Sequence, residues 1–138
     1  IPQIAGKDEI PAAGFLFEPG KAMMKAGGYN MICSRFCLKK LGRSTHYYIG
    51  GDDLKESVVT ELHGLGKTFR ILECDSLDKR SIKRIAAMYP KAEVTARNLP
   101  MDTDTLRKKL GTVSSDTYHI FGLKSDTAGN LLLVTTRQ

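Results

Sequence analysis

Four basic residues lie close together between residues 78 and 89 and could bind a polyanion. The apolar residues of this stretch recur three, four and seven positions apart, as on one face of a helix: Ile82, Ile85, Ala86 and Tyr89. The basic residues fall on the other side: Lys79, Arg80, Lys83 and Arg84. Like charges this close repel by a few tenths of a kcal/mol per pair, and a bound polyanion would reverse that repulsion. The alternative is an ordinary solvated helix face.

Arg97 and Asn98 form a second candidate site, at the point where a predicted strand ends. Ligand-binding groups in open α/β sheets usually lie at the carboxyl ends of parallel strands. The planar guanidinium and amide groups are suited to donate hydrogen bonds to phosphates and base edges. The alternative is structural, with Asn98 accommodating the turn and Arg97 paired with a nearby acid.

Metal binding has weaker support. The chain has three cysteines, of which Cys33 and Cys37 would share one face of a helix, and three histidines. Zinc sites usually show two ligand pairs at short spacing, and no second pair follows here. We therefore expect no metal site. Such sparse cysteine usage does not fit a secreted disulfide framework and favours a reducing cytoplasm.

The sequence lacks the motifs of common enzyme sites. It has no G-x-S-x-G, no G-x-x-x-x-G-K-[ST], no H-E-x-x-H and no G-x-G-x-x-G after a strand. The run Gly50-Gly51-Asp52-Asp53 has the spacing of neither a phosphate loop nor a metal loop and indicates a polar turn. We expect no catalytic residue and no bound cofactor in this chain.

The elements that would position these groups are clearest in the second half of the chain. A strand at 67–73, a helix at 78–89 and a strand at 93–97 form a βαβ unit, which usually joins parallel strands. A helix at 103–110 follows, with Asp102 or Thr103 as N-cap and basic residues in its last turn. Strands at 118–124 and 131–136 complete the sheet as an antiparallel hairpin.

The first half is less regular. Residues 1–14 contain two prolines and two glycines and are expected to be a linker or the tail of a preceding domain. The expected elements after them are a strand at 15–17, helices at 21–26 and 29–41, and a strand at 46–49. The acidic segment 52–61 is not assigned. The fold class is therefore a single compact α/β domain with a mixed sheet and helices packed on it, spanning 15–138.

Size and charge agree with one globular domain. The chain has 138 residues, of which 41% are hydrophobic, and no apolar run is long enough to cross a membrane. Its net charge is +6, concentrated in two basic blocks, 15–50 and 79–110, on either side of an acidic one. The chain does not begin with Met, so we expect it to be part of a longer protein.

Several sequence blocks resemble one known family. They are FLFEPGKAMMKAGG at 15–28, THYY at 45–48, KTFRIL at 67–72, ARNLP and TLRKKL within 96–110, and YHIFGL and LLLVTTR within 118–137. Together they resemble the THUMP-like C-terminal domain of bacterial class I S-adenosylmethionine-dependent methyltransferases, most closely the Bacteroidetes type. The most specific blocks are E-P-x-x-x-x-x-K-A-G and A-R-N-x-P, which carry Lys25, Arg97 and Asn98.

The resemblance implies an accessory role. Domains of the THUMP kind are associated with binding structured RNA, notably tRNA, and presenting it to an attached catalytic domain. S-adenosylmethionine would bind in that catalytic domain. The expected RNA-binding residues are Lys25, Arg97 and Asn98, which lie in the two specific blocks, together with four from the basic helix, which is not a family motif: Lys79, Arg80, Lys83 and Arg84. The alternative is a structural domain that docks on its own N-terminal methyltransferase domain or dimerises without binding RNA.

Overall fold

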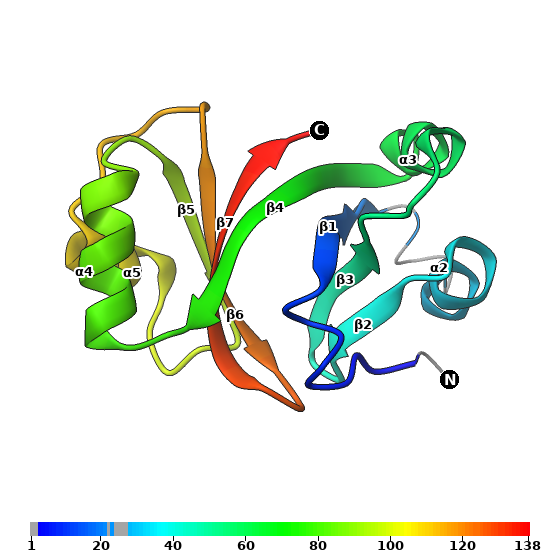
Figure 1. Cartoon of the computed structure of the whole chain (residues 1–138), viewed down its shortest axis with the longest axis horizontal. Coiled ribbons are helices and arrows are strands. Elements are labelled where there is room, and N and C mark those ends of the chain that lie inside the picture. Colours follow the sequence, from blue (N-terminus) through cyan, green and yellow to red (C-terminus); the bar gives the residue numbers. More distant parts are fainter. Residues whose placement is uncertain (1–2, 22, 24–27) are drawn as a thin grey trace.

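The computed structural model describes residues 3–21, 23 and 28–138. In this part of the chain, seven strands and four helices follow one another (Figure 1). Their order and bounds are β1 Ala13–Pro19, α2 Tyr29–Phe36, β2 Lys39–Gly42, β3 Thr45–Gly51, α3 Glu56–His63, β4 Gly66–Ser76, α4 Lys79–Met88, β5 Glu93–Arg97, α5 Thr103–Leu110, β6 His119–Ser125 and β7 Gly129–Arg137.

All seven strands belong to one mixed sheet, in the order β2-β3-β1-β4-β7-β6-β5. Only β5 and β6 pair in parallel, and every other neighbouring pair is antiparallel. The long strand β4 pairs with β1 through its first residues and with β7 through most of its length. In Figure 1 it crosses from α3 to the beginning of α4, so that one strand joins the two sides of the molecule.

The sheet curls so that strands β1 and β3 face strands β6 and β7 across a central core. Leu16 of β1 and Tyr47 of β3 belong to this core together with Phe121 of β6 and Leu133 of β7. The alternate residues of the same strands point outward, and there they meet the helices. Tyr48 lies in a second core with residues of α2 and α3, and Ile120 lies in a third with residues of α4 and α5.

The elements predicted in the second half of the chain are confirmed. Asp78 caps α4 by accepting a hydrogen bond from the Ser81 amide at 2.8 Å, and Asp102 caps α5 in the same way through Thr105. Gly111 ends α5 in the left-handed conformation. The β6–β7 hairpin is antiparallel, as expected. Both helices pack on one face of the sheet through Ile85 and Leu106, which are fully buried.

The two strands of the predicted βαβ unit, β4 and β5, are not adjacent in the sheet. Strands β4 and β5 run in the same direction, but β7 and β6 lie between them. The adjacent parallel pair is β5–β6, connected through α5. This arrangement arises because the C-terminal hairpin inserts into the sheet instead of adding to its edge.

The predicted helix 29–41 is too long. Helix α2 ends at Phe36, Cys37 adopts the left-handed conformation with φ 57°, and β2 follows. Pairing of β2 with β3 stabilises the extended conformation here and overrides the helical pattern. Lys40, expected on the outer face of a helix, is 5% exposed, and its ammonium group donates to the Arg43 carbonyl at 2.8 Å.

The segment before β1 and helix α3 also contribute buried residues. The chain before β1 packs on the sheet, with Ala5 and Ile10 buried in the central core. The acidic segment 52–61 contains most of α3, whose Val59 and Leu62 are buried. The helix predicted at 21–26 falls mostly outside the described residues, as does Lys25. No helix of the described chain is long and apolar enough to span a membrane.

Candidate functional site

Helix α4 exposes most of its predicted basic residues. Its N-cap and the buried Ile85 fix its rotation about its own axis, so that Lys79, Arg80 and Lys83 face solvent. Lys79 and Lys83 line a surface hollow of about 370 Å³ together with Lys109 of α5. The apolar floor of this hollow includes Ile82. Lys109 was not among the residues predicted to bind RNA, although its place in the last turn of α5 indicates an exposed cation.

Arg84 differs from the other basic residues of α4 because it is paired within the chain. Its guanidinium contacts the carboxylate of Glu73 at 2.7 Å and that of Asp75, both on β4. Partial burial acts to raise the pKa of Glu73, but hydrogen bonds from Tyr89 and Arg84 outweigh it and leave this pKa below its usual value. Arg84 therefore holds α4 against β4. Among the residues that the structure describes, Lys79, Arg80 and Lys83 of this helix have no ion-pair partner.

The structure separates Arg97 and Asn98 from the α4 surface. Ala96 and Val94 of β5 pack under the helices, so Arg97 lies on the opposite face of the sheet. Asn98 adopts a left-handed conformation with φ 57°, which asparagine tolerates better than most residues. Its amide nitrogen donates to the Ser44 carbonyl and, at 3.2 Å, to the Thr45 hydroxyl.

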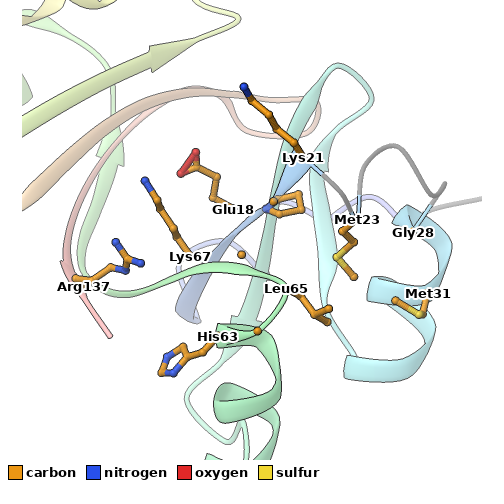
Figure 2. A pocket seen from close by; sticks show the side chains of 13 residues that line it. Glu18, Lys21, Met23, Gly28, Met31, His63, Leu65, Lys67 and Arg137 are labelled. Atoms are coloured by element: carbon orange, nitrogen blue, oxygen red, sulfur yellow. The ribbon is translucent and has the colours of Figure 1, made fainter.

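A groove of about 1010 Å³ lies where β1 and β7 end and β4 begins. The charged side chains along it include Glu18, Lys21, Lys67 and Arg137. Figure 2 shows Lys67 and Arg137 side by side, with Glu18 on the same side of the ribbon and His63 below them. This cluster of cations was not predicted from the sequence.

Close backbone contacts form the floor of the groove. Pro19 of β1 is paired with Gly66 of β4, and the Gly20 amide donates to the Leu65 carbonyl at 2.8 Å. A Cβ atom at Gly66 would lie 2.1 Å from the Glu18 carbonyl oxygen. The Glu-Pro-Gly segment of the first specific sequence block thus has a structural role in this contact.

A second hollow of about 370 Å³ adjoins the groove and shares Lys67 and Arg137 with it. Its other lining residues are Phe69, Glu93, Asp116, Tyr118 and His119. The Arg137 guanidinium lies over the Phe69 ring, 5.6 Å from its centroid, and the His119 ring stacks on Phe121 at 4.0 Å. The hollow therefore combines cations, carboxylates and aromatic rings.

The pKa of His119 depends on its burial and on the charges around this hollow. Its Nε2 atom lies 2.7 Å from the Thr95 hydroxyl. Its pKa is lowered to about 4, mainly by burial; Glu93 acts in the opposite direction, and the positive charges of Lys67, Arg137 and Arg97 add to the lowering. His119 is thus neutral at pH 7, and Arg97 belongs electrostatically to this inner face of the sheet.

Family models match two parts of this fold. Residues 66–137, from β4 to the end of β7, match a model described as THUMP domain-like. The chain belongs to the THUMP domain-like family. Residues 15–56 match a model described as a ferredoxin-like domain. We refer to 66–137 as the THUMP-like part and to 15–56 as the ferredoxin-like part.

One solved structure supports the same fold. It is the crystal structure of a "putative methyltransferase" from Porphyromonas gingivalis W83, which matches with a TM-score of 0.77 at 23% sequence identity. The match covers 98% of this chain and 31% of the other, so the chain spans about a third of that protein's length. A search of curated proteins found no match.

The two family parts are joined by β4 and by contacts between turns. The Asn98 contacts link the THUMP-like part to the β2–β3 turn of the ferredoxin-like part. In the same region the Arg43 amide donates to Asp126 at 2.8 Å, and the Thr45 hydroxyl donates to the Lys124 carbonyl at 2.7 Å. The second specific sequence block, around Asn98, thus also has a structural role.

The cysteines and histidines do not gather. Cys33 is half-buried on α2, while Cys37 follows that helix and is exposed. Among the described residues, no three side chains of the His, Cys, Asp or Glu type form a group that could hold a metal ion.

Proposed function

We propose that this chain is an RNA-binding accessory domain of a methyltransferase. It would present structured RNA, with tRNA as the first candidate, to a catalytic domain elsewhere in a longer protein. The THUMP domain-like family supports this role, because RNA binding is typical of THUMP domains. The description of the longer structural neighbour as a methyltransferase supports the presence of a catalytic partner.

The observation that carries the proposal is a set of exposed cations on α4 and α5. Within the described chain none of them has a carboxylate within ion-pair distance: Lys79, Arg80, Lys83 and Lys109. Unpaired cations on one surface attract a polyanion and gain free energy by releasing its counterions. Arg84, which is neutralised by Glu73 and Asp75, would contribute less to such binding.

Binding of a tRNA transcript at several salt concentrations tests the proposal. The affinity should fall as salt rises, and the double variant Lys79→Gln/Lys83→Gln should reduce the salt slope by about 0.9 for each phosphate that is no longer neutralised. The matched control is Lys7→Gln/Lys55→Gln, which removes two exposed lysines elsewhere. Absence of binding even at low salt would contradict the proposal and favour docking on a methyltransferase domain.

We also place the S-adenosylmethionine site outside this chain. Nucleotide-type cofactors usually need a glycine-rich turn between a strand and a helix. The turns after β4 and β5 contain no glycine, and the Asp78 and Asp102 carboxylates occupy the helix N-termini that follow them. Calorimetric titration with the cofactor should give no saturable heat at micromolar concentration. A saturable heat would contradict this assignment.

A further inference from the structure

Lys67 and Arg137 occupy the centre of a continuous surface depression. They are shared by the groove at the start of β4 and by the smaller hollow beside it. Phe69 and Arg137 are directly opposite each other in the β4–β7 pairing, and Lys67 precedes Phe69 by two positions. All three side chains therefore lie on the same face of the sheet.

Glu18 is directly opposite Lys67 in the β1–β4 pairing, and it is the acidic residue that lines the groove beside the two cations. Among the described residues no carboxylate lies within ion-pair distance of either. Both act on the half-buried His119 ring as positive charges, together with Arg97. The centre of the depression thus attracts an anion, and a phosphate group bound between Lys67 and Arg137 would contact both.

The smaller hollow, which has Glu93 and Asp116 in its lining, differs from the groove in its chemistry. Its carboxylates, Glu93 and Asp116, repel a free phosphate but accept hydrogen bonds from amino groups. Its rings belong to Phe69, which is 3% exposed and lies under the Arg137 guanidinium, and to Tyr118 and His119, which are half-buried. A nucleotide has an anionic phosphate, a flat base and, in adenine, cytosine and guanine, an amino group, so it matches this arrangement of charges and rings.

We propose that this depression binds an unpaired nucleotide of the RNA, with its phosphate on Lys67 and Arg137 and its base in the hollow beside Tyr118. The inference rests on the proposed function and adds a site for one unpaired nucleotide to the basic surface of α4. Bases that carry an amino group should be preferred to uracil, because uracil presents two carbonyls where the carboxylates lie.

Short single-stranded RNA tests this site separately from the α4 surface. Fluorescently labelled hexamers of adenosine, cytidine or uridine are titrated into the 138-residue chain at low salt. The adenosine and cytidine hexamers should bind more tightly than the uridine hexamer. The variant Lys67→Gln/Arg137→Gln should weaken their binding at least tenfold and lower the salt slope by about 0.7 for each phosphate that is no longer neutralised. The matched control Lys7→Gln/Lys55→Gln, which removes two exposed lysines away from both surfaces, should change hexamer affinity less than twofold.

Two further measurements localise the base. Asp116→Asn should reduce the preference for cytidine over uridine without changing the salt slope. In the unmodified chain, nuclear magnetic resonance should show hexamer-dependent shifts at the amides of Lys67, Tyr118 and His119, which gives a result even if a variant fails to fold. Hexamer binding that depends on Lys79 and Lys83 instead, or no hexamer binding, would overturn the inference. The tRNA titration with the α4 variants would still decide the proposed function.

Discussion

The side-chain amide of Asn98 lies 3.2 Å from the hydroxyl of Thr45, a residue 53 positions earlier in the chain. The same amide nitrogen also donates to the Ser44 carbonyl. Asn98 therefore connects the turn after β5, in the THUMP-like part, with the β2–β3 turn of the ferredoxin-like part.

Substitutions at Asn98 should separate its hydrogen bonds from its backbone conformation. Asn98→Gly keeps the left-handed conformation but removes both hydrogen bonds, so it should lower the free energy of unfolding by about 1–2 kcal/mol. Asn98→Ala should lower the free energy of unfolding by about 1 kcal/mol more than Asn98→Gly does, because alanine is strained at φ 57°. Urea denaturation measures both. Equal stabilities of Asn98→Gly and the unmodified chain would show that these hydrogen bonds contribute nothing.

Asn98 is also one of the predicted RNA-binding residues, and the same variants test that prediction. If Asn98 contacts RNA directly, Asn98→Gly should narrow the difference in affinity between tRNA and a generic duplex, with little change in salt slope. The test is made at a temperature at which the variant remains folded. An unchanged difference would leave Asn98 with its structural role alone.

Gly66→Ala should be strongly destabilising. The added Cβ atom would lie 2.1 Å from the Glu18 carbonyl oxygen, so β1 and β4 would have to move apart, at a cost of about 1–3 kcal/mol or more. The control is Gly64→Ala, two residues earlier, where the nearest atom would be 3.5 Å away and φ is −75°. Thermal denaturation should show little change for Gly64→Ala. A similar decrease in stability in both variants would contradict the close approach of β1 to Gly66.

Arg84→Ala should lower stability more than Lys83→Ala, whereas Lys83→Ala should weaken tRNA binding more than Arg84→Ala. Arg84 is paired with Glu73 and Asp75, so its removal should lower the free energy of unfolding, although its side chain is 42% exposed and solvent weakens the pairing. Lys83 is exposed and unpaired in the described chain, and its removal should change stability by less than about 0.5 kcal/mol. For tRNA affinity the order should reverse, with the larger effect at Lys83. Equal effects on stability would contradict the pairing.

The Arg84 pair should also affect the acid side of the stability profile. The folded-state pKa of Glu73 lies below its ordinary value of 4.5. Its contribution to stability is thus complete above the unfolded-state pKa and is lost as the pH falls through the folded-state pKa. Between about pH 5 and pH 3, stability should therefore fall less steeply in Arg84→Ala than in the unmodified chain. Equal slopes would show that Arg84 does not stabilise the Glu73 carboxylate.

His119 should give a separate pH dependence at higher pH. Its pKa is about 4 in the folded chain against an ordinary value of 6.5, so the unfolded state takes up a proton as the pH falls below 6.5 while the folded state does not. Stability should decrease from pH 6.5 to pH 4, by roughly 2–3 kcal/mol. His119→Phe should flatten this decrease, measured as the slope of unfolding free energy against pH. A ring that titrates near pH 6.5 by nuclear magnetic resonance would disprove this assignment.

Sequence patterns predicted the second half of the fold because its signals are local. Asp78 and Asp102 cap helices whose apolar residues recur at helical spacing, and the strands alternate. The error at helix 29–41 has a non-local cause. Cys37 ends α2 without a glycine, and the strand that follows is held by pairing with β3.

The candidate site was predicted only in part for the same reason. The exposure of Lys79 and Lys83 follows from helical spacing, but the partners of Arg84 lie on β4, a separate element. Lys67 and Arg137 are 70 residues apart and become neighbours only through the β4–β7 pairing. No sequence pattern indicated that pairing, because β7 returns to the middle of the sheet.

Strand β4 connects the ferredoxin-like part and the THUMP-like part by pairing with a strand of each. It hydrogen-bonds to β1 on one side and to β7 on the other, so neither part can rotate against the other without breaking strand pairing. The junction between the two families is thus rigid, and heating should melt both parts in a single cooperative transition. A chain cut between residues 56 and 66 would expose an unpaired strand edge on each piece and would be prone to aggregation.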